Sequence, residues 1–302
     1  MSLLLGACSG LNKNTVSYQM SKYDTSKYYV VSADAQTKQQ AQSSALDAMR
    51  QDIITQVPAA EPALVADIIA NAKAEKVWKD KESNTKHYYA LAVLPREKAR
   101  AILEPRLDQA DTQLSGLAQQ FSTPADPLSD LKVAYKMQPI IESRIALDDL
   151  YQFLDESRRS YKAETFAPYK NIFKEKMRAV LVGVEVDGVE SATLTTYVVD
   201  ALNKLGLGVV KADDPNKALL VKIETETDNY NSKKIDGLVW CSSSAAISLT
   251  DAQNGATFSR FDAHERAGTS RYEESLRRSM QSIGESVAPQ IVARLEAFLK
   301  TR

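Results

Sequence analysis

The spacing of apolar residues changes twice along the chain, from a mixed strand and helix pattern to a helical one and back. Between residues 27 and 96, the β-rich run 28–33 precedes apolar positions three and four residues apart over 41–57. A second short helix is expected over residues 62–71. The apolar runs 76–78 and 88–94 flank the polar turn 81–84, which indicates a β-hairpin. A strand, two helices and a hairpin together predict a small α/β sandwich.

Between residues 97 and 176 the apolar positions follow helical spacing almost throughout, with Pro105 inside the pattern and a proline-containing break at 122–127. The first stripe comprises Ala99, Ile102, Leu103, Leu107, Leu114, Leu117 and Phe121, and the second comprises Leu131, Ala134, Met137, Ile141, Ile145, Leu150 and Leu154. Two amphipathic segments joined by a short loop predict an antiparallel helical hairpin. The hairpin is interpreted either as a spacer packed on a domain or as a projecting arm for a partner. A charged connector over 156–176 is expected to end in a helix.

The last part, residues 177–302, alternates strand and helix patterns in the order β-α-β-β-β-β-α. The apolar run 179–184 is typical of a buried strand, and a helical stripe over 194–205 ends at Gly206. Alternation over 219–225 predicts a half-exposed strand, and a hairpin turns at 251–255 before a closing helix over 272–299. The predicted fold class is therefore α+β. Two small α/β sandwich domains, 27–96 and 177–302, are linked by the long antiparallel helical hairpin of 97–176.

The beginning of the chain carries a separate signal. Leu5-Gly6-Ala7-Cys8 resembles a bacterial lipobox, where small residues let the backbone enter a narrow peptidase cleft and the Cys8 thiol receives the lipid. The resemblance implies a cleaved signal peptide, acylation of Cys8 including palmitate, and a polar tether within residues 1–26. Ser9 in place of an acidic residue implies sorting to the outer membrane, on its periplasmic face. Because the residues before Cys8 lack a basic n-region and a full apolar h-region, an ordinary free cysteine is the alternative.

Composition narrows the choice of partners. Lys and Arg total 38 against 39 Asp and Glu, so the formal net charge of -1 suggests neither nucleic acid nor an anionic membrane face as a partner. No run approaches the ~18 apolar residues of a membrane-spanning helix, so membrane contact is expected through the lipid anchor only. With Cys8 acylated, the one other cysteine, Cys241, has no disulfide partner within the chain, and we expect it to be buried and inert.

Two family resemblances follow from these patterns. The strand at 28–35, the helix of Ala41, Ala45 and Ala48, and the runs 77–80 and 88–96 resemble the Lpp-twenty lipoprotein family, whose module is similar to one in flagellar assembly protein T. The C-terminal order of elements, with Leu249-Thr250-Asp251 and Gly255 in its hairpin, resembles a bacterial envelope module. That module occurs in the N-terminal domain of TolB, in the lipoprotein activator of penicillin-binding protein 1B and in the curli-secretion lipoprotein. Both resemblances imply binding or assembly of envelope proteins, without an active site.

Candidate chemical groups are scattered along the sequence. The two histidines, His87 and His264, fall in different predicted domains and have no further ligand at zinc spacing. The serines 242–244 lie within a predicted strand and lack the Gly-x-Ser-x-Gly turn of a hydrolase nucleophile. Gly206-Leu207-Gly208 follows a helix and has no third glycine, so it indicates a helix cap instead of a dinucleotide loop.

Two carboxylate pairs, Asp213-Asp214 and Glu224 with Glu226, complete the candidates. The first is expected in a turn and the second on an exposed strand face, and neither has the ligand spacing of a calcium loop. We therefore predict no catalytic residue, no metal and no cofactor.

The sequence favours a non-enzymatic outer-membrane lipoprotein that scaffolds or regulates another envelope protein. One alternative is a subunit of a homo-oligomeric secretion or flagellar assembly. A second is a cell-wall hydrolase, which needs two carboxylates in one cleft, one of them with a raised pKa.

Overall fold

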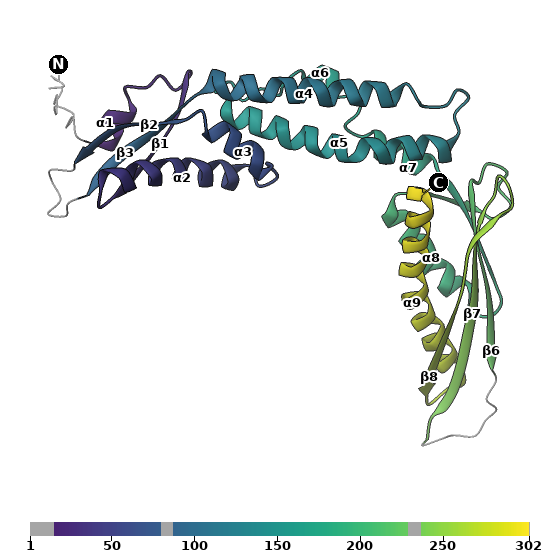
Figure 1. Ribbon diagram of the computed structural model, residues 1–302. Helices are drawn as coiled ribbons and strands as arrows, with labels where there is room; N and C mark the ends of the chain where they lie inside the picture. The colour runs from purple at the N-terminus through teal and green to yellow at the C-terminus, as the bar shows by residue number, and fades with distance from the viewer. Residues whose placement is uncertain (1–14, 80–86, 229–236, 302) are drawn as a thin grey trace, which may run out of the picture. The chain divides into compact units, whose positions relative to one another are not determined.

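The computed structural model describes residues 15–79, 87–228 and 237–301. The chain divides into two compact units, each built from segments that are distant in the sequence. Unit 1 comprises Met1–Ser115 with Ile140–Ala167, and unit 2 comprises Gly116–Pro139 with Pro168–Arg302. Each unit contains one sheet together with helices (Figure 1), so the fold class is α+β, as predicted.

The helices and strands follow one another in an order close to the predicted one. They are α1 (Val16–Met20), β1 (Tyr28–Ala35), α2 (Lys38–Gln56), α3 (Pro62–Ile69), β2 (Lys73–Lys79), β3 (Tyr88–Pro95), α4 (Arg96–Ala118), α5 (Pro127–Leu154), α6 (Ala163–Phe166), α7 (Ile172–Ala179), β4 (Leu181–Asp187), α8 (Ser191–Leu205), β5 (Gly208–Lys211), β6 (Leu219–Asp228), β7 (Val239–Asp251), β8 (Thr257–Thr269) and α9 (Tyr272–Thr301). No helix in these described ranges is long and apolar enough to cross a membrane.

Unit 1 holds an antiparallel sheet in the order β1-β3-β2. Thr37 caps α2 by accepting a hydrogen bond from the Gln40 amide at 3.2 Å. The fully buried alanines Ala41 and Ala45 then let α2 lie close on the sheet. The predicted pairing of β2 with β3 is confirmed, whereas the predicted turn at 81–84 lies outside the described residues.

The helices α4 and α5 form the predicted antiparallel hairpin (Figure 1). Within unit 1, Asp111 of α4 contacts Arg144 of α5, and Glu104 accepts a hydrogen bond from Tyr151, so later residues of α4 meet earlier residues of α5. The predicted stripe on α5 is wrong at Ile145, whose side chain is 37% exposed. Arg144 is fully buried instead, because positions 141, 144 and 148 keep the 3.6-residue period of one helix face. The first stripe is also too long, since α4 ends before Phe121.

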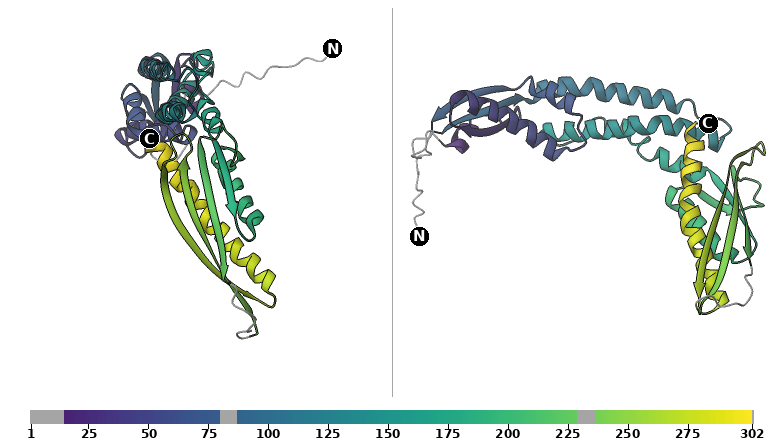
Figure 2. Two further views of the ribbon diagram at one scale, coloured as in Figure 1. Left: turned by 90° about the vertical axis from the view of Figure 1, so that its right-hand side faces the viewer. Right: turned by 60° about the horizontal axis from the view of Figure 1, so that its bottom comes forward.

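Unit 2 contains a five-stranded sheet in the order β5-β4-β6-β7-β8. The strand β4 is parallel to both β5 and β6, and the remaining pairs are antiparallel, which confirms the predicted order of C-terminal elements. Both α8 and α9 cover one face of this sheet (Figure 1), and α9 runs along its length over β7 and β8 (Figure 2). Cys241 is fully buried in this core, as predicted.

The two hydrophobic cores share α5. Leu128, Leu131 and Ala134 from its first half lie in the core of unit 2, whereas Leu150 and Leu154 from its last turns lie in the core of unit 1. A description of residues 97–176 as a separate hairpin domain, with boundaries at 26, 96 and 176, therefore stays a prediction.

Candidate protein-binding groove

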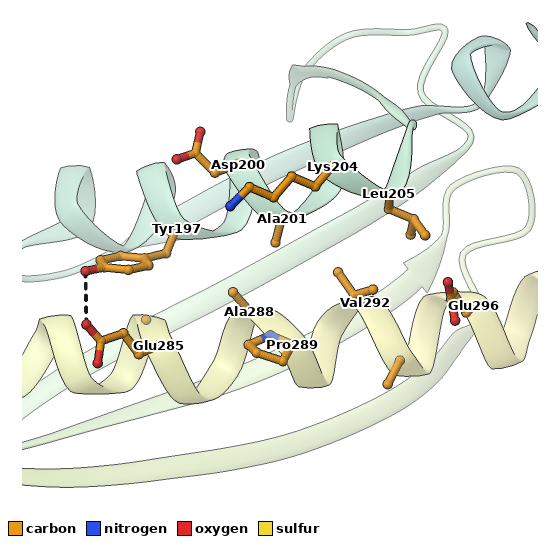
Figure 3. Close-up of a pocket in the computed structure, with 12 residues that line it drawn as sticks. Tyr197, Asp200, Ala201, Lys204, Leu205, Glu285, Ala288, Pro289, Val292 and Glu296 are labelled. Carbon is orange, nitrogen blue, oxygen red and sulfur yellow. Dashed lines mark hydrogen bonds between the residues drawn. The ribbon is translucent and has the colours of Figure 1, made fainter. Parts of the chain in front are cut away.

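Unit 2 has a groove of about 650 Å³ between α8 and α9 (Figure 3). This volume lies within the range of pockets that bind ligands and peptide side chains. The floor is apolar, and the charged side chains stand along its sides. The floor residues are Ala201, Leu205, Ala288, Pro289, Val292 and Ala293, and the polar lining residues are Tyr197, Asp200, Lys204, Glu285 and Glu296.

The topology of the sheet makes the two helices parallel. Because β4 is parallel to β6, and β6–β7 and β7–β8 are both antiparallel, β4 and β8 run in the same direction. Each helix runs antiparallel to the strand that precedes it, so α8 and α9 are parallel. Apolar residues with helical spacing, such as Val198 and Ile291, point into the core. The lining residues occupy the neighbouring helix faces, which leaves them open to a partner.

One end of the groove is closed by a close approach of the two helices. A Cβ added at Gly284 would lie 2.6 Å from Cδ2 of Tyr197, so the aromatic ring occupies the space that a side chain at 284 would need. The Tyr197 hydroxyl donates a hydrogen bond to Oε1 of Glu285 at 3.4 Å. The same carboxylate oxygen accepts a bond from Nε2 of Gln281 at 3.1 Å.

Pro289 interrupts the hydrogen bonding of α9 beside the groove. Because proline has no N–H, the carbonyl of Glu285 does not receive the intrahelical hydrogen bond that position 289 would normally donate. Glu285 and Pro289, about one helical turn apart, both line the groove.

The charged lining residues have an excess of negative charge. Asp200, Glu285 and Glu296 contribute three carboxylates and Lys204 one ammonium group, a formal sum of -2. Lys300 pairs with Glu296 at 3.7 Å. Glu285, next to the apolar floor, is a carboxylate with which a cation on a bound partner could pair.

The sequence-based candidates are dispersed in the structure. The lipidation candidate, Cys8, lies outside the described residues. His87 pairs with Asp34 at 3.0 Å in unit 1, and His264 is exposed on β8 in unit 2. Among the described residues, no group of three or more His, Cys, Asp or Glu side chains could hold a metal ion.

The serines on β7 point alternately to the two faces of the sheet. Ser243 points into the core, where its hydroxyl lies 2.6 Å from that of Ser279. On the other face, Ser244 stands between Glu226 of β6 and His264 of β8. A hydrolytic triad needs the histidine between the serine and the acid, so this order does not match one.

The carboxylate pairs show simple structural roles. Asp214 Oδ1 accepts a hydrogen bond from the Asn216 amide at 2.8 Å, which makes the predicted turn. Glu224 pairs with Lys222 at 2.9 Å on the exposed face of β6, and Glu226 is exposed there too. Hydrogen bonding lowers the pKa of Asp108 and of Asp126, opposite to the raised pKa of a hydrolase acid.

Sequence reasoning did not identify the groove. Its signals were the small residues Gly284 and Ala288, one helical turn apart, and Pro289 within a long helical pattern. These features indicate a groove only once α8 is known to lie beside this part of α9.

The chain matches no protein-family model and no curated protein. Among solved structures, a secreted protein of Helicobacter pylori covers 88% of this chain and 97% of its own, at 13% identity and a TM-score of 0.40. A Caulobacter crescentus protein described as a lipoprotein covers 41% and 95%, at 13% identity and a TM-score of 0.31. A lipoprotein of Neisseria meningitidis covers 37% and 96%, at 17% identity and a TM-score of 0.26. These likenesses assign neither a family nor a function, and the resemblances inferred from the sequence stay predictions.

Proposed function

We propose that this chain is a non-enzymatic envelope lipoprotein that binds another envelope protein through the groove between α8 and α9. The observation that carries the proposal is the apolar floor of the groove with Glu285 beside it. The occupant we propose is an amphipathic helix that carries a basic residue next to its apolar stripe.

The geometry favours a helix as the occupant. Two parallel helices separated by a shallow apolar floor accept the side-chain ridge of a third helix, as in other helix-in-groove complexes. From Tyr197 to Leu205 the floor extends over eight residues of α8, or about 12 Å at 1.5 Å per residue. Two to three helical turns of a partner would cover it, and a lysine or arginine of the partner could reach the Glu285 carboxylate.

Photocrosslinking in cells tests the docking site in the full-length chain. A photoreactive amino acid at Ala293, in the groove, should give one adduct with a single envelope protein. The same amino acid at Ala192, an exposed position of α8 outside the groove, should not give that adduct. Peptide mapping should place the attached partner residue in an amphipathic helix with a neighbouring basic side chain.

A matched pair of substitutions provides the control. Val292→Arg places a charge on the groove floor and should abolish the adduct, whereas Val189→Arg, at an exposed position outside the groove, should leave it intact. Equal labelling from 192 and 293, or no labelling from either, would show that the groove is not the docking site. An adduct of two copies of this chain would favour the homo-oligomeric assembly, for which β8 offers an edge strand of 13 residues.

The lipid anchor and the absence of enzymatic activity need separate measurements. Wild-type protein from the native gene should fractionate with membranes and carry acyl chains at Cys8 by mass spectrometry, and Cys8→Ala should be released. If both proteins are released from membranes and carry no acyl chain, the proposed lipid anchor is contradicted. Turnover of labelled peptidoglycan by the purified chain would overturn the non-enzymatic assignment and favour the hydrolase.

A further inference from the structure

One face of the unit 1 sheet carries lysine and aromatic side chains together. Ala90, Ala92 and Leu94 of β3 lie in the core beneath α2, so the alternate residues, including Leu91, point to the opposite face. The strand register places Glu75 next to Leu91 on that face. This membrane-contact candidate, called the outer face below, is made by α1, β2 and β3.

The helix α1 lies over the outer face. The hydroxyl of Tyr23, just after α1, donates a hydrogen bond to Glu75 at 3.0 Å. Gln19 of α1 is only 6% exposed. The bond from Tyr23 to Glu75 therefore ties the polypeptide that follows residue 15 to β2 on this face.

Lys22 and Lys76 place two cationic side chains on the outer face. Lys76 is the extra residue of a β-bulge between Glu75 and Val77, with φ of 52°, and its side chain is exposed. Side-chain contact with Lys22 is the largest cause of the lowered pKa of Lys76. Lys22 also lies 4.5 Å from the centre of the Tyr18 ring. Two neighbouring ammonium groups repel each other, and an anion between them would remove that repulsion.

Aromatic rings continue the outer face beyond the lysine pair. Trp78 stacks on Tyr89 with ring centroids 5.5 Å apart and an interplanar angle of 18°, and both side chains are half-buried. Tryptophan and tyrosine, with an apolar ring and a polar group, are enriched at the headgroup level of membranes. Three lysines, at positions 22, 73 and 76, outnumber two carboxylates on this side of the sheet, whereas the whole chain is almost neutral. The carboxylates are those of Glu75 and of Asp34, which neighbours Tyr89 and pairs with His87.

Chain length brings the outer face close to a bilayer if Cys8 is acylated, so this inference rests on the proposed lipid anchor. Thr15 follows Cys8 by seven residues, which span at most about 25 Å when fully extended. Thr15 caps α1 by accepting a hydrogen bond from the Tyr18 amide at 3.3 Å. The outer face is therefore the part of the described structure that directly follows the anchor.

We propose that the outer face contacts an anionic phospholipid surface, with a lipid phosphate between Lys22 and Lys76 and the rings of Trp78 and Tyr89 among the headgroups. The contact would add a second attachment to the acyl chains. It would also fix which side of unit 1 faces the bilayer.

Vesicle binding by the unacylated full chain, Cys8→Ala, separates this contact from the anchor. We expect binding to phosphatidylglycerol vesicles and not to phosphatidylcholine vesicles. Each lysine at an anionic surface contributes about five-fold to the partition coefficient, so Lys22→Glu with Lys76→Glu should lower it about 25-fold or more. Lys38→Glu with Arg50→Glu makes the same change in charge on α2, on the opposite side of the sheet, and should have little effect.

The fluorescence of Trp78 provides a second readout. In a Trp240→Phe background Trp78 is the sole tryptophan, and brominated phosphatidylglycerol should quench its emission. Equal loss of binding in both double variants, or unquenched Trp78, would overturn the proposal. Displacement by inorganic phosphate, but not by chloride at equal ionic strength, would assign the lysine pair to free phosphate instead. If the proposed lipid anchor is wrong, wild-type Cys8 will lack acyl chains. The vesicle assay is independent of that result, because it uses the unacylated Cys8→Ala chain.

Discussion

At the scale of single residues, Arg144 is a charged side chain that is fully buried in unit 1 and must have its charge compensated there. Its Nε donates to Asp111 at 2.8 Å, its Nη1 lies 3.4 Å from Asp148, and its Nη2 donates to the Tyr161 carbonyl at 2.6 Å. The guanidinium also stacks over Phe166, 4.9 Å from the ring centre. A buried charge is tolerated only when it is paired in this way. Arg144 therefore ties α4 and α5 to the segment that enters α6.

Removing this cation should strongly destabilise unit 1. Arg144→Ala leaves Asp111 and Asp148 buried without their partner, and we expect a loss of about 3–5 kcal/mol in the free energy of unfolding. Urea denaturation followed by Trp78 fluorescence, in a Trp240→Phe background, measures it. The control is Arg100→Ala, which removes a pair with Asp155 at 3.5 Å from a 41% exposed side chain and should cost below about 1 kcal/mol. Similar losses of unfolding free energy in the two variants would contradict a stabilising role for the buried Arg144.

There is a physical reason why the sequence did not predict the buried ion pairs of Arg144. Hydrophobic periodicity assigns apolar residues to the buried face, so the predicted stripe included Ile145 and not Arg144. The burial of Arg144 depends on Asp111, which is 33 residues away in another helix. Such pairing is visible only when the hairpin register is known.

At the scale of elements, Asp126 begins α5. Its carboxylate accepts hydrogen bonds from the Ser129 hydroxyl at 2.6 Å and from the Leu128 amide at 3.2 Å, and Pro127 occupies the first helical position. Hydrogen bonding by Ser129 is the largest cause that lowers the pKa of Asp126 below its ordinary value of 3.8.

This cap makes part of the stability of unit 2 dependent on pH. Asp126→Ala should lower the free energy of unfolding by about 1 kcal/mol at neutral pH. Because the folded-state pKa lies below 3.8, the ionic contribution is present above that pH and is lost as the pH falls through the folded value. Urea denaturation followed by Trp240, with Trp78→Phe, should show the gap between wild type and variant shrinking below pH 4. The gap between Asp126→Asn, which keeps an acceptor without a charge, and Asp126→Ala should not shrink, because neither variant titrates at this position.

The crossing of α8 and α9 depends on Gly284. Adding a methyl group there forces the Tyr197 ring to move, so Gly284→Ala should destabilise unit 2 by about 1–3 kcal/mol. In a Tyr197→Ala background the clash is absent, and the higher helix propensity of alanine should make the same change neutral or stabilising by up to about 1 kcal/mol. A double-mutant cycle from urea denaturation measures the coupling. Additive effects would show that the ring and the glycine do not share that space.

The existence and order of the elements followed from local sequence much more closely than the groove did. Thr37, Pro58 and Gly206 mark helix ends through their own backbone and side-chain chemistry, and alternation marked β6 without reference to its neighbours. The groove requires two helices separated by most of a domain to become parallel neighbours. Their local patterns indicate apolar faces but not which faces meet.

At the scale of the whole molecule, the long helix α5 does not belong to one unit. Sequence patterns suggested a hairpin domain between two sandwiches because helical spacing extends on both sides of the break at 122–127. Periodicity reports which residues are buried but not the core that buries them. Leu131 and Leu150, both fully buried on the same helix, lie in the cores of unit 2 and unit 1 respectively.

These two leucines test the division of the chain. Leu131→Ala removes packing from unit 2 and Leu150→Ala removes packing from unit 1, each at a cost of about 2–5 kcal/mol. In a Trp78→Phe background, Leu131→Ala should lower the urea midpoint reported by Trp240 fluorescence. In a Trp240→Phe background, Leu150→Ala should lower the urea midpoint reported by Trp78 fluorescence. Each substitution should leave the other midpoint nearly unchanged. If residues 97–176 formed an independent hairpin domain, both substitutions would instead destabilise that domain, and neither tryptophan transition would respond selectively.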